Sequence, residues 1–252
     1  MSRETPSWVV ADDFVDVDLG TLKTGKEAEI RIVERTRADG GGRHLLAEKR
    51  YRPKTVSYKG ELEVLGFAKA ATFRNDVGYR EARAIRNSRD RRAVAKMTKR
   101  GREVVRHDWV GHEFEVLRSL WEAGVPVPFP VSTDGTSSVL LQFLGDDDGA
   151  APRLAQARLG AAGVRSAWAQ LVDALRSIVE AGWVHADLSA YNLLWWDERL
   201  WVIDVPQAVD LFASTQGYEL LHRDVANVCA WFASKGVTDA DDPDAVFASL
   251  LG

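Results

Sequence analysis

The sequence predicts an α+β fold in two parts, a small antiparallel sheet with one helix and then a compact, mainly helical part. Two patterns support this fold class. Apolar and polar residues alternate at 14–19, and two further strands are predicted at 28–33 and 44–51. A period of two is typical of half-buried strands. Apolar residues recur at helical spacing at 163–182 and at about 218–234, which predicts amphipathic helices. The strands therefore come first in the chain and the longest helices last.

Turn and cap residues bound the elements of the first part. Turns at 20–27 and 38–42 join the three strands into one antiparallel sheet. Asp108 is the predicted N-cap of a helix at 109–123, because Asp is a preferred residue at this position. The charged region at about 53–107 lacks periodicity, and so long a connection is typical of a flexible loop.

A boundary between the two parts is predicted close to residue 144. An apolar strand at 139–144 is followed by the polar sequence G-D-D-D-G at 145–149. We therefore place the first part at about 14–143 and the second at about 144–252.

The charge is distributed unevenly along the chain. The formal net charge is −4, but residues 80–106 contain eleven Lys and Arg against three Asp and Glu, a local excess of +8. A basic segment on an acidic body is typical either of a surface for an anionic partner or of a solvated loop. The sequence leaves both interpretations open.

The composition indicates a cytoplasmic protein. The single cysteine, Cys229, excludes an intramolecular disulfide, which suits a reducing compartment. No apolar run approaches the length of a membrane span, and the first residues lack the apolar core of a secretory signal. We therefore expect a cytoplasmic location and no membrane partner, and the sequence leaves the oligomeric state open.

The stretch at 183–204 carries the strongest chemical signal. It contains the spacing His185-x-Asp187-x-x-x-x-Asn192, then a predicted hairpin, then Asp204. Mg²⁺ prefers oxygen ligands, usually one or two carboxylates with substrate phosphates, and phosphoryl transfer needs a carboxylate that aligns or deprotonates the attacking hydroxyl. Each of these residues alone is usually a turn residue. Their combination predicts Asp187 as the catalytic residue and Asn192 and Asp204 as metal ligands.

The first predicted turn offers a candidate phosphate-binding loop. It nearly matches a P-loop, but Glu27 stands where that motif has a hydroxyl. A strand rather than a helix is predicted to follow, so the turn lacks the helix N-terminus that strengthens a P-loop. A loop between two strands, covering the phosphates with Thr24, Gly25 and Lys26, fits better.

Lys49 is the predicted lysine for the nucleotide phosphates, because it lies on the strand where such a lysine is placed in kinases. On spacing alone, either Glu113 or Glu115 of the next predicted helix could pair with it. Backbone groups near Gln142 and Leu144, beside the predicted boundary, are the candidates for binding adenine.

Seven short motifs occur in order along the chain: T-G-K-E-A (24–28), L-A-E-K (46–49), W-V-G-H-E (109–113), V-P-V-P (125–128), H-A-D-L-S-A-Y-N (185–192), I-D-V-P-Q-A-V (203–209) and R-D-V-A-N-V (223–228). This set resembles the RIO family of atypical serine/threonine protein kinases. The resemblance extends from about residue 20 to residue 232. It implies one two-lobed protein-kinase-like domain over residues 1–252, and the subgroup without an N-terminal winged helix.

The resemblance also implies ligands and roles. It implies ATP and Mg²⁺, with Mn²⁺ as an alternative ion. It casts Lys49 and Asp187 as catalytic, Glu113 as the partner of Lys49, and Asn192 and Asp204 as metal ligands. The basic loop at about 53–107 would correspond to the family's flexible loop, where serine autophosphorylation is typical, and Ser57 and Ser88 are candidate acceptors.

The predicted activity is therefore ATP- and Mg²⁺-dependent phosphoryl transfer by a RIO-type kinase. Only 48 residues follow Asp204, which leaves little room for a platform that binds peptide substrates. We expect phosphorylation of the protein itself or of a folded partner, or ATP hydrolysis that switches an assembly.

Two other functions remain open from the sequence. The first is a nucleotide-binding scaffold with little catalysis that docks on RNA or a ribonucleoprotein through residues 80–106. Such binding would weaken steeply with salt. The second is a P-loop NTPase, in which Lys26 rather than Lys49 would be indispensable.

Overall fold

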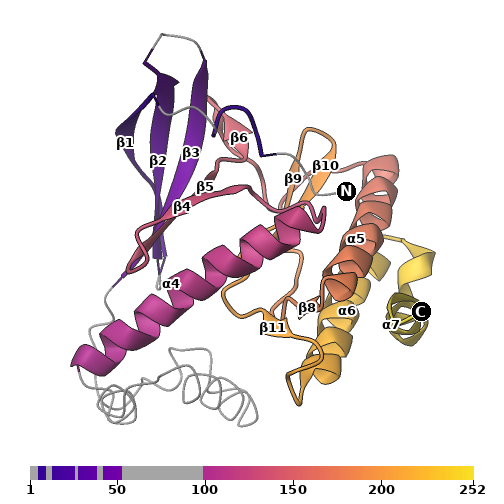
Figure 1. Cartoon of the computed structure of the whole chain (residues 1–252). Coiled ribbons are helices and arrows are strands. Elements are labelled where there is room, and N and C mark those ends of the chain that lie inside the picture. Colours follow the sequence, from indigo (N-terminus) through magenta and orange to yellow (C-terminus); the bar gives the residue numbers. More distant parts are fainter. Residues whose placement is uncertain (1–4, 10–12, 26–27, 39–41, 53–98) are drawn as a thin grey trace.

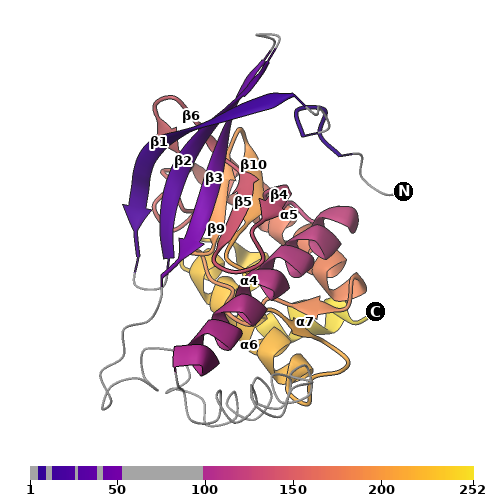
Figure 2. The same ribbon diagram turned by 60° about the vertical axis from the view of Figure 1, so that its left-hand side comes forward.

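The computed structural model describes residues 5–9, 13–25, 28–38, 42–52 and 99–252. It confirms the predicted α+β fold in two lobes, a five-stranded antiparallel sheet followed by a mainly helical lobe (Figure 1). Helix α4 lies along the sheet in both views (Figures 1 and 2), and helices α5, α6 and α7 lie together on the far side of α4.

The sheet has the strand order β1-β2-β3-β5-β4, and all neighbouring pairs are antiparallel. Its strands are β1 (Phe14–Thr24), β2 (Ala28–Arg37), β3 (Arg43–Tyr51), β4 (Pro130–Thr133) and β5 (Ser138–Gln142). The predicted strands are confirmed, and the turn predicted at 38–42 separates β2 from β3. The turn predicted at 20–27 is wrong in its first part, because residues 20–24 continue β1 and pair with β2. The prediction missed β4, which begins at a proline and occupies a sheet edge, where a residue without an N–H group is tolerated.

Helix α4 (Lys99–Glu122) begins earlier than predicted. The N-cap prediction for Asp108 is wrong, and residues 99–107, which we expected in a loop, are helical. The first turns contain several Lys, Arg and Glu residues, which favour helix formation, but they lack the regular apolar spacing on which the prediction rested. The rest of the predicted loop, with Ser57 and Ser88, lies outside the described residues.

The second lobe contains the helices α5 (Ala161–Glu180), α6 (Gly217–Ala233) and α7 (Pro243–Leu250), a 3₁₀ helix (Thr238–Ala240), and the short strands β6 (Gly145–Asp146), β7 (Gly149–Ala150), β8 (Trp183–Val184), β9 (Leu193–Trp196), β10 (Arg199–Val202) and β11 (Val209–Asp210). The helices predicted at 163–182 and 218–234 are confirmed as α5 and α6. Gly182 follows α5 with a φ of 78° and donates its N–H to the Val179 carbonyl at 2.9 Å. A glycine in this left-handed conformation is the common way to end a helix.

The apolar core has a large and a small part. The large part joins the second half of α4 to α5, α6 and α7, with fully buried residues such as Leu117, Leu171 and Phe232. The small part contains Tyr51, Val110 and Val139 and lies between the sheet and α4. The small part therefore holds α4 against the face of the sheet from which the side chain of Tyr51 projects. None of the described helices combines the length and the apolar character needed to cross a membrane.

A two-residue turn joins β9 to β10 and is held by α5. Trp196 pairs with Arg199, so the turn consists of Asp197 and Glu198, with φ angles of 51° and 54°. The side chain of Gln170 accepts the N–H of Leu200 at 2.9 Å and donates to the Glu198 carbonyl at 3.0 Å. This hairpin leads directly into Ile203 and Asp204, so Gln170 helps to fix where the chain enters the candidate site.

Candidate active site

Lys49 connects both lobes. Side chains alternate across a strand, so Lys49 and Tyr51 of β3 lie on the face that α4 covers. The Nζ atom of Lys49 lies 2.6 Å from Oε1 of Glu113 in α4 and 2.8 Å from Oδ1 of Asp204 beyond β10. The alternative partner Glu115 is exposed. The structure therefore brings together the lysine, the helix glutamate and the strand-terminal aspartate that the sequence singled out.

The charge on Lys49 is stabilised by its neighbours. Its side chain is only 12% exposed, and burial alone would lower its pKa because it disfavours the charged form. The negative charge of Glu113, with that of Asp204, outweighs burial and raises the pKa of Lys49 well above its ordinary value. Lys49 is therefore a cation at any pH at which a nucleotide would bind.

The loop between β8 and β9 presents Asp187 and Asn192. The Nδ2 atom of Asn192 donates to the backbone carbonyl of Asp187 at 2.8 Å and to its Oδ2 atom at 3.2 Å. Both bonds use the nitrogen of the amide, so Oδ1 is the atom of Asn192 that can ligate a metal. The two residues are thus oriented as one unit.

The carboxyls of Asp187 and Asp204 are shifted in opposite directions. Burial raises the pKa of Asp187 above its ordinary value. The ammonium group of Lys49 lowers the pKa of Asp204. Two carboxyls whose pKa values are moved apart are suited to different roles. Asp187 has the more basic carboxylate, which suits proton handling, while Asp204 remains ionised, which suits a metal ligand.

Asp224 of α6 fixes the backbone on both sides of Asp187. It is 1% exposed and accepts the N–H groups of Ala186 at 2.6 Å and Leu188 at 3.0 Å. Ala186 has a φ of 64°, a conformation that is unfavourable for a residue with a side chain and needs support from its surroundings. Arg223 donates to the carbonyl of Ala186. From the sequence, Arg223 and Asp224 were expected only to pair with neighbours, and no role in the site was predicted for Asp224, although it lies in one of the motifs that carried the resemblance.

His185 links this loop to the other metal-binding candidate. Its side chain is buried, and its Nε2 atom lies 3.0 Å from the carbonyl oxygen of Ile203. The neighbouring residue Asp204 has a φ of 66°. The histidine of the predicted motif therefore holds the strand end that carries Asp204, rather than facing solvent.

A segment after β7 supports the loop from the outside and was not predicted. Ala155 donates its N–H to the Ala190 carbonyl at 3.0 Å, and Leu154 donates to the Leu193 carbonyl at 2.8 Å. The guanidinium group of Arg153 donates to the carbonyl of Tyr191, next to Asn192. Hydrogen bonds between backbone groups of two loops leave no pattern of side chains, so the sequence carried no signal for them.

The predicted phosphate-binding turn lies at the same end of the sheet as Lys49. Thr24 ends β1, and Gly25 donates its N–H to the Ala28 carbonyl at 2.9 Å. Ala28 and Tyr51 are register partners, and Thr24 pairs with Glu29, so Thr24 and Gly25 lie at the end of the sheet where β3 ends. A Cβ atom at Gly25 would lie 3.1 Å from the Ala28 oxygen, so a larger residue here would need a small shift of the backbone. Lys26 lies outside the described residues.

The predicted adenine-binding region lies between β5 and β6. The backbone N–H of Gln142 donates to the Phe129 carbonyl at 2.9 Å, and its side-chain Oε1 accepts the N–H of Phe129 at 3.3 Å. The carbonyl of Leu144 accepts the N–H of Ala151 at 2.8 Å. These groups are committed within the protein, so adenine recognition here would fall to other backbone atoms of the segment.

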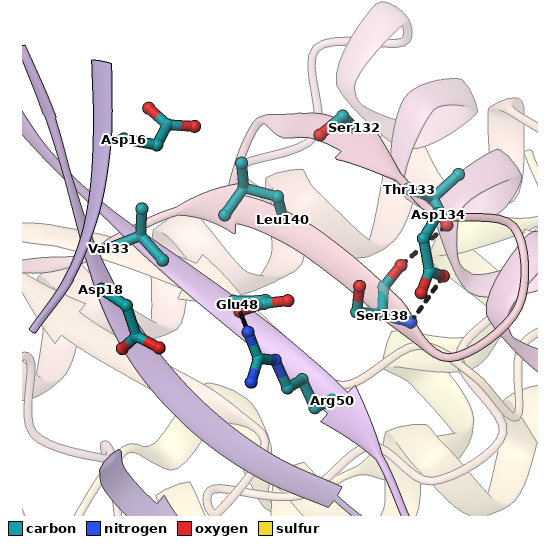
Figure 3. Close-up of a pocket in the computed structure, with 10 residues that line it drawn as sticks. All are labelled: Asp16, Asp18, Val33, Glu48, Arg50, Ser132, Thr133, Asp134, Ser138 and Leu140. Carbon is teal, nitrogen blue, oxygen red and sulfur yellow. Dashed lines mark hydrogen bonds and ion pairs between the residues drawn. The ribbon is translucent and has the colours of Figure 1, made fainter. Parts of the chain in front are cut away.

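A pocket of about 410 Å³ lies on the face of the sheet opposite to the one that carries Lys49 (Figure 3). Glu48 and Arg50 of β3 line it, and they point away from Lys49 because of the strand alternation. Its carboxylates have partners within the protein: Asp16 pairs with Arg35, Asp18 with Arg31, Glu48 with Arg50, and Asp134 accepts N–H groups of its own turn. This pocket is therefore separate from the candidate active site.

The donor set fits Mg²⁺ with a nucleotide. The two candidate ligands, Asn192 and Asp204, supply oxygen atoms only, as a hard cation requires. Within the described ranges, no three His, Cys, Asp or Glu side chains form a metal cage. A magnesium ion in a phosphoryl-transfer site takes few protein ligands and completes its shell with phosphates and water, so this sparse set suits it.

Comparisons with known proteins agree with the motifs. A family model described as a RIO domain matches residues 68–245. The chain is 32% identical over 244 residues to the RIO-type serine/threonine-protein kinase Rio1 of Haloferax volcanii, which covers 97% of this chain and 72% of that relative. It is 33% identical over 152 residues to the serine/threonine-protein kinase RIO3 of Mus musculus, which covers 60% of this chain and 29% of the relative. It is 32% identical over 220 residues to the serine/threonine-protein kinase RIO1 of Caenorhabditis elegans. That match covers 86% of this chain and 37% of the relative. The chain thus spans well under half the length of these two animal relatives.

Proposed function

Because the chain belongs to the RIO family, as its motifs predicted, we propose that it is an ATP- and Mg²⁺-dependent serine/threonine protein kinase. The observation that carries this proposal is the position of Lys49, which bonds Glu113 of α4 and Asp204 of the second lobe at the same time. A cation held between two carboxylates from separate segments supports this proposal, because the phosphates of a nucleotide bound between the lobes would need a fixed positive charge.

The proposed ligands are ATP and Mg²⁺, with Mn²⁺ as the alternative ion. Asn192 through Oδ1 and Asp204 through its carboxylate would hold the metal, which neutralises charge on the transferred phosphoryl group when it is bound. Thr24, Gly25 and Lys26 would lie over the phosphates, and backbone atoms near Gln142 and Leu144 would contact adenine.

The protein's own residues have distinct proposed roles. Asp187 orients the acceptor hydroxyl and accepts its proton, for which its raised pKa is suited. Lys49 contacts the phosphates and is oriented by Glu113. Most of the rate enhancement in such a site comes from positioning and from fixed charges rather than from covalent chemistry.

The acceptor is proposed to be the protein itself or a folded partner, and ATP hydrolysis is the related alternative. Ser57 and Ser88 remain candidate sites of autophosphorylation. The basic segment at about 53–107 is the proposed contact for a protein or ribonucleoprotein partner, in the cytoplasm, and 1–252 is the proposed extent of the single domain, with its lobes at about 14–143 and 144–252.

The other two interpretations receive less support. A scaffold with little catalysis does not require Asp187, Asn192, Asp204 and Lys49 to come together, and the relatives described above are named as kinases. A P-loop NTPase needs a helix after the glycine-rich turn, whereas β2 follows it at Ala28.

A labelling assay tests the proposal. The full chain is incubated with Mg²⁺ and γ-labelled ATP, and both labelled protein and free phosphate are followed. We expect signal from the wild type and its loss in Asp187→Ala and Asp204→Ala. Asp173→Ala serves as a matched control, because this exposed carboxylate on α5 pairs with its neighbour Arg176, away from the site, and its loss should leave the signal unchanged. Equal background in the wild type and both site variants would overturn the proposed activity.

A further inference from the structure

The two oxygen atoms of Glu113 have different donors. Oε1 lies 2.6 Å from Nζ of Lys49, and Oε2 accepts the phenolic hydroxyl of Tyr51. Glu113 is 1% exposed, so water cannot readily replace either donor. An ionised carboxylate has only these two acceptor atoms, and donors on both of them fix its plane as well as its position.

Tyr51 is itself rigidly placed. It is 7% exposed and packs against Val110 and Val139. Its backbone N–H donates to the carbonyl of Ser137 at 2.7 Å. The ring is therefore held by β5 on one side and α4 on the other, and its hydroxyl has one direction in which to point.

Tyr51 remains a donor across the working range of pH. Burial raises the pKa of its hydroxyl, and the charge of Glu113 raises it further. The ring of Tyr51 also lies under the ammonium group of Lys49, with 5.1 Å between Nζ and the ring centroid, a distance at which a cation and an aromatic face attract each other. One side chain thus contacts both members of the Lys49–Glu113 pair.

The backbone of α4 is fixed by other contacts. His112, next to Glu113, lies with Nε2 2.8 Å from the carbonyl oxygen of Ala208. Trp183 donates from Nε1 to the hydroxyl of Ser119 at 3.0 Å. These bonds tie α4 to the second lobe without Tyr51. Removing the Tyr51 hydroxyl should therefore release the side chain of Glu113 while the helix stays in place.

We propose that Tyr51 is a positioning residue that orients Lys49 toward the phosphates of the nucleotide by holding the second oxygen of Glu113. This inference rests on the proposed kinase function and adds to it a residue for which the sequence gave no signal. A residue that only packs in the core would need its ring, whereas this role needs its hydroxyl.

The Tyr51→Phe variant separates these two roles, because it keeps the ring. It leaves Oε2 of Glu113 buried without its donor, and we expect the Kd for MgATP and the KM for ATP to rise about fivefold to tenfold. The KM for the phosphoacceptor should change by less than about twofold, since Lys49 is not expected to touch it. Tyr218→Phe is the matched control, because it removes one hydroxyl from a residue that is 49% exposed on α6, and it should bind ATP as the wild type does.

A double-mutant cycle with Glu113→Ala identifies the residue through which Tyr51 acts. If Tyr51 acts through Glu113, Tyr51→Phe should change the Kd for MgATP by less than about twofold when Glu113 is already absent. Equal effects of Tyr51→Phe in both backgrounds would overturn the inference. So would a Tyr51→Phe variant that loses thermal stability but binds MgATP like the wild type, because that result describes a packing role.

The binding measurements keep this test separate from that of the kinase activity. A wild type that binds MgATP without transferring or releasing phosphate would overturn the proposed activity, while the cycle of Kd values would still decide the role of Tyr51. A wild type that turns over ATP, with a Tyr51→Phe variant indistinguishable from it in Kd and KM, would overturn only the inference about Tyr51.

Discussion

The ammonium group of Lys49 lies 2.8 Å from Oδ1 of Asp204, a residue 155 positions further along the chain. The same group lies 2.6 Å from Oε1 of Glu113, but the two carboxylates differ in their exposure. The side chain of Glu113 is almost fully buried, whereas that of Asp204 is 45% exposed. The bond to Glu113 is therefore mainly a structural one, and the bond to Asp204 is the one that a metal and phosphates can readily reorganise.

Replacing Lys49 by methionine should reduce both stability and activity. The substitution leaves the carboxylate of Glu113 buried without its cation, and breaking a buried pair from one side costs about 3 kcal/mol or more. We expect the free energy of unfolding in urea to fall by that amount. Phosphoryl transfer should fall at least about a hundredfold, because a fixed positive charge at the phosphates is lost.

A double substitution tests whether these two losses are separate. Lys49→Met combined with Glu113→Leu replaces the ion pair by two apolar side chains, which is often neutral for stability. The double variant should regain part of the lost unfolding free energy, because the buried hydroxyl of Tyr51 also loses its acceptor, and it should remain inactive. Recovery of activity together with stability would contradict a direct role of Lys49 in phosphoryl transfer.

Replacing Asn192 by alanine should weaken the response to Mg²⁺. The change removes one oxygen ligand and also the two hydrogen bonds that orient Asp187. We expect the Mg²⁺ concentration for half-maximal activity to rise about tenfold or more, by analogy with the loss of groups that orient metal ligands. Asn227→Ala is the control, because this exposed amide on α6 makes a long bond to the Leu188 carbonyl, at 3.5 Å, and is not a proposed ligand. An unchanged Mg²⁺ requirement in Asn192→Ala would exclude Asn192 as a ligand.

Asp224 should make the stability of the protein depend on pH. Burial raises its pKa above the ordinary value of 3.8, although the N–H groups of Ala186 and Leu188 and the charges of His185 and Arg223 act in the opposite direction. Between the unfolded and the folded pKa, the folded state binds more protons than the unfolded state, so its stability falls as pH rises. The contribution of Asp224 is therefore complete below the unfolded pKa and is lost as pH rises through the folded pKa.

This contribution can be isolated by urea unfolding. The wild type and Asp224→Asn are unfolded at a series of pH values from about pH 3 to about pH 8. Asparagine cannot ionise, so the unfolding free energy of the wild type minus that of the variant should decrease as pH rises and then become constant. A difference that instead grows with pH would mean that the hydrogen bonds and Arg223 dominate over burial. A chelator in all samples keeps metal binding out of the comparison.

The turn between β9 and β10 offers a stabilising substitution. Glu198 has a φ of 54°, and this left-handed conformation costs a residue with a Cβ atom about 1–2 kcal/mol, part of which glycine would lose again through its greater freedom in the unfolded chain. We expect Glu198→Gly to raise the free energy of unfolding by about 0.5–1 kcal/mol. The bond from Gln170 reaches the backbone carbonyl of residue 198 and should be kept, so phosphoryl transfer should not change. A lower melting temperature than that of the wild type would count against this interpretation of the turn.

The predictions that succeeded rest on local rules. Strand period, turn residues and the apolar stripes of α5 and α6 each depend on neighbours in the chain, and these elements appear where the sequence placed them. The start of α4 was missed for the same reason, because its first turns are helical through the intrinsic preference of charged residues and not through an apolar pattern. β4 was missed because it begins at a proline, which usually argues against a strand. A strand at the edge of a sheet tolerates proline, but the edge position is known only from the tertiary structure.

The sequence by itself supplied the candidate side chains for the proposed chemistry: Lys49, Asp187, Asn192 and Asp204 were singled out from their types, spacing and order. Only the tertiary structure decided which groups hold them. It confirmed Glu113, which the family resemblance implied and spacing alone left open, as the partner of Lys49. It also placed Tyr51 on the second oxygen of Glu113, and Asp224 and Arg153 behind the loop of Asp187. These contacts join residues far apart in the chain, and several use backbone atoms that every residue shares. Spacing cannot reveal such partners, because their geometry is fixed only when the two lobes pack.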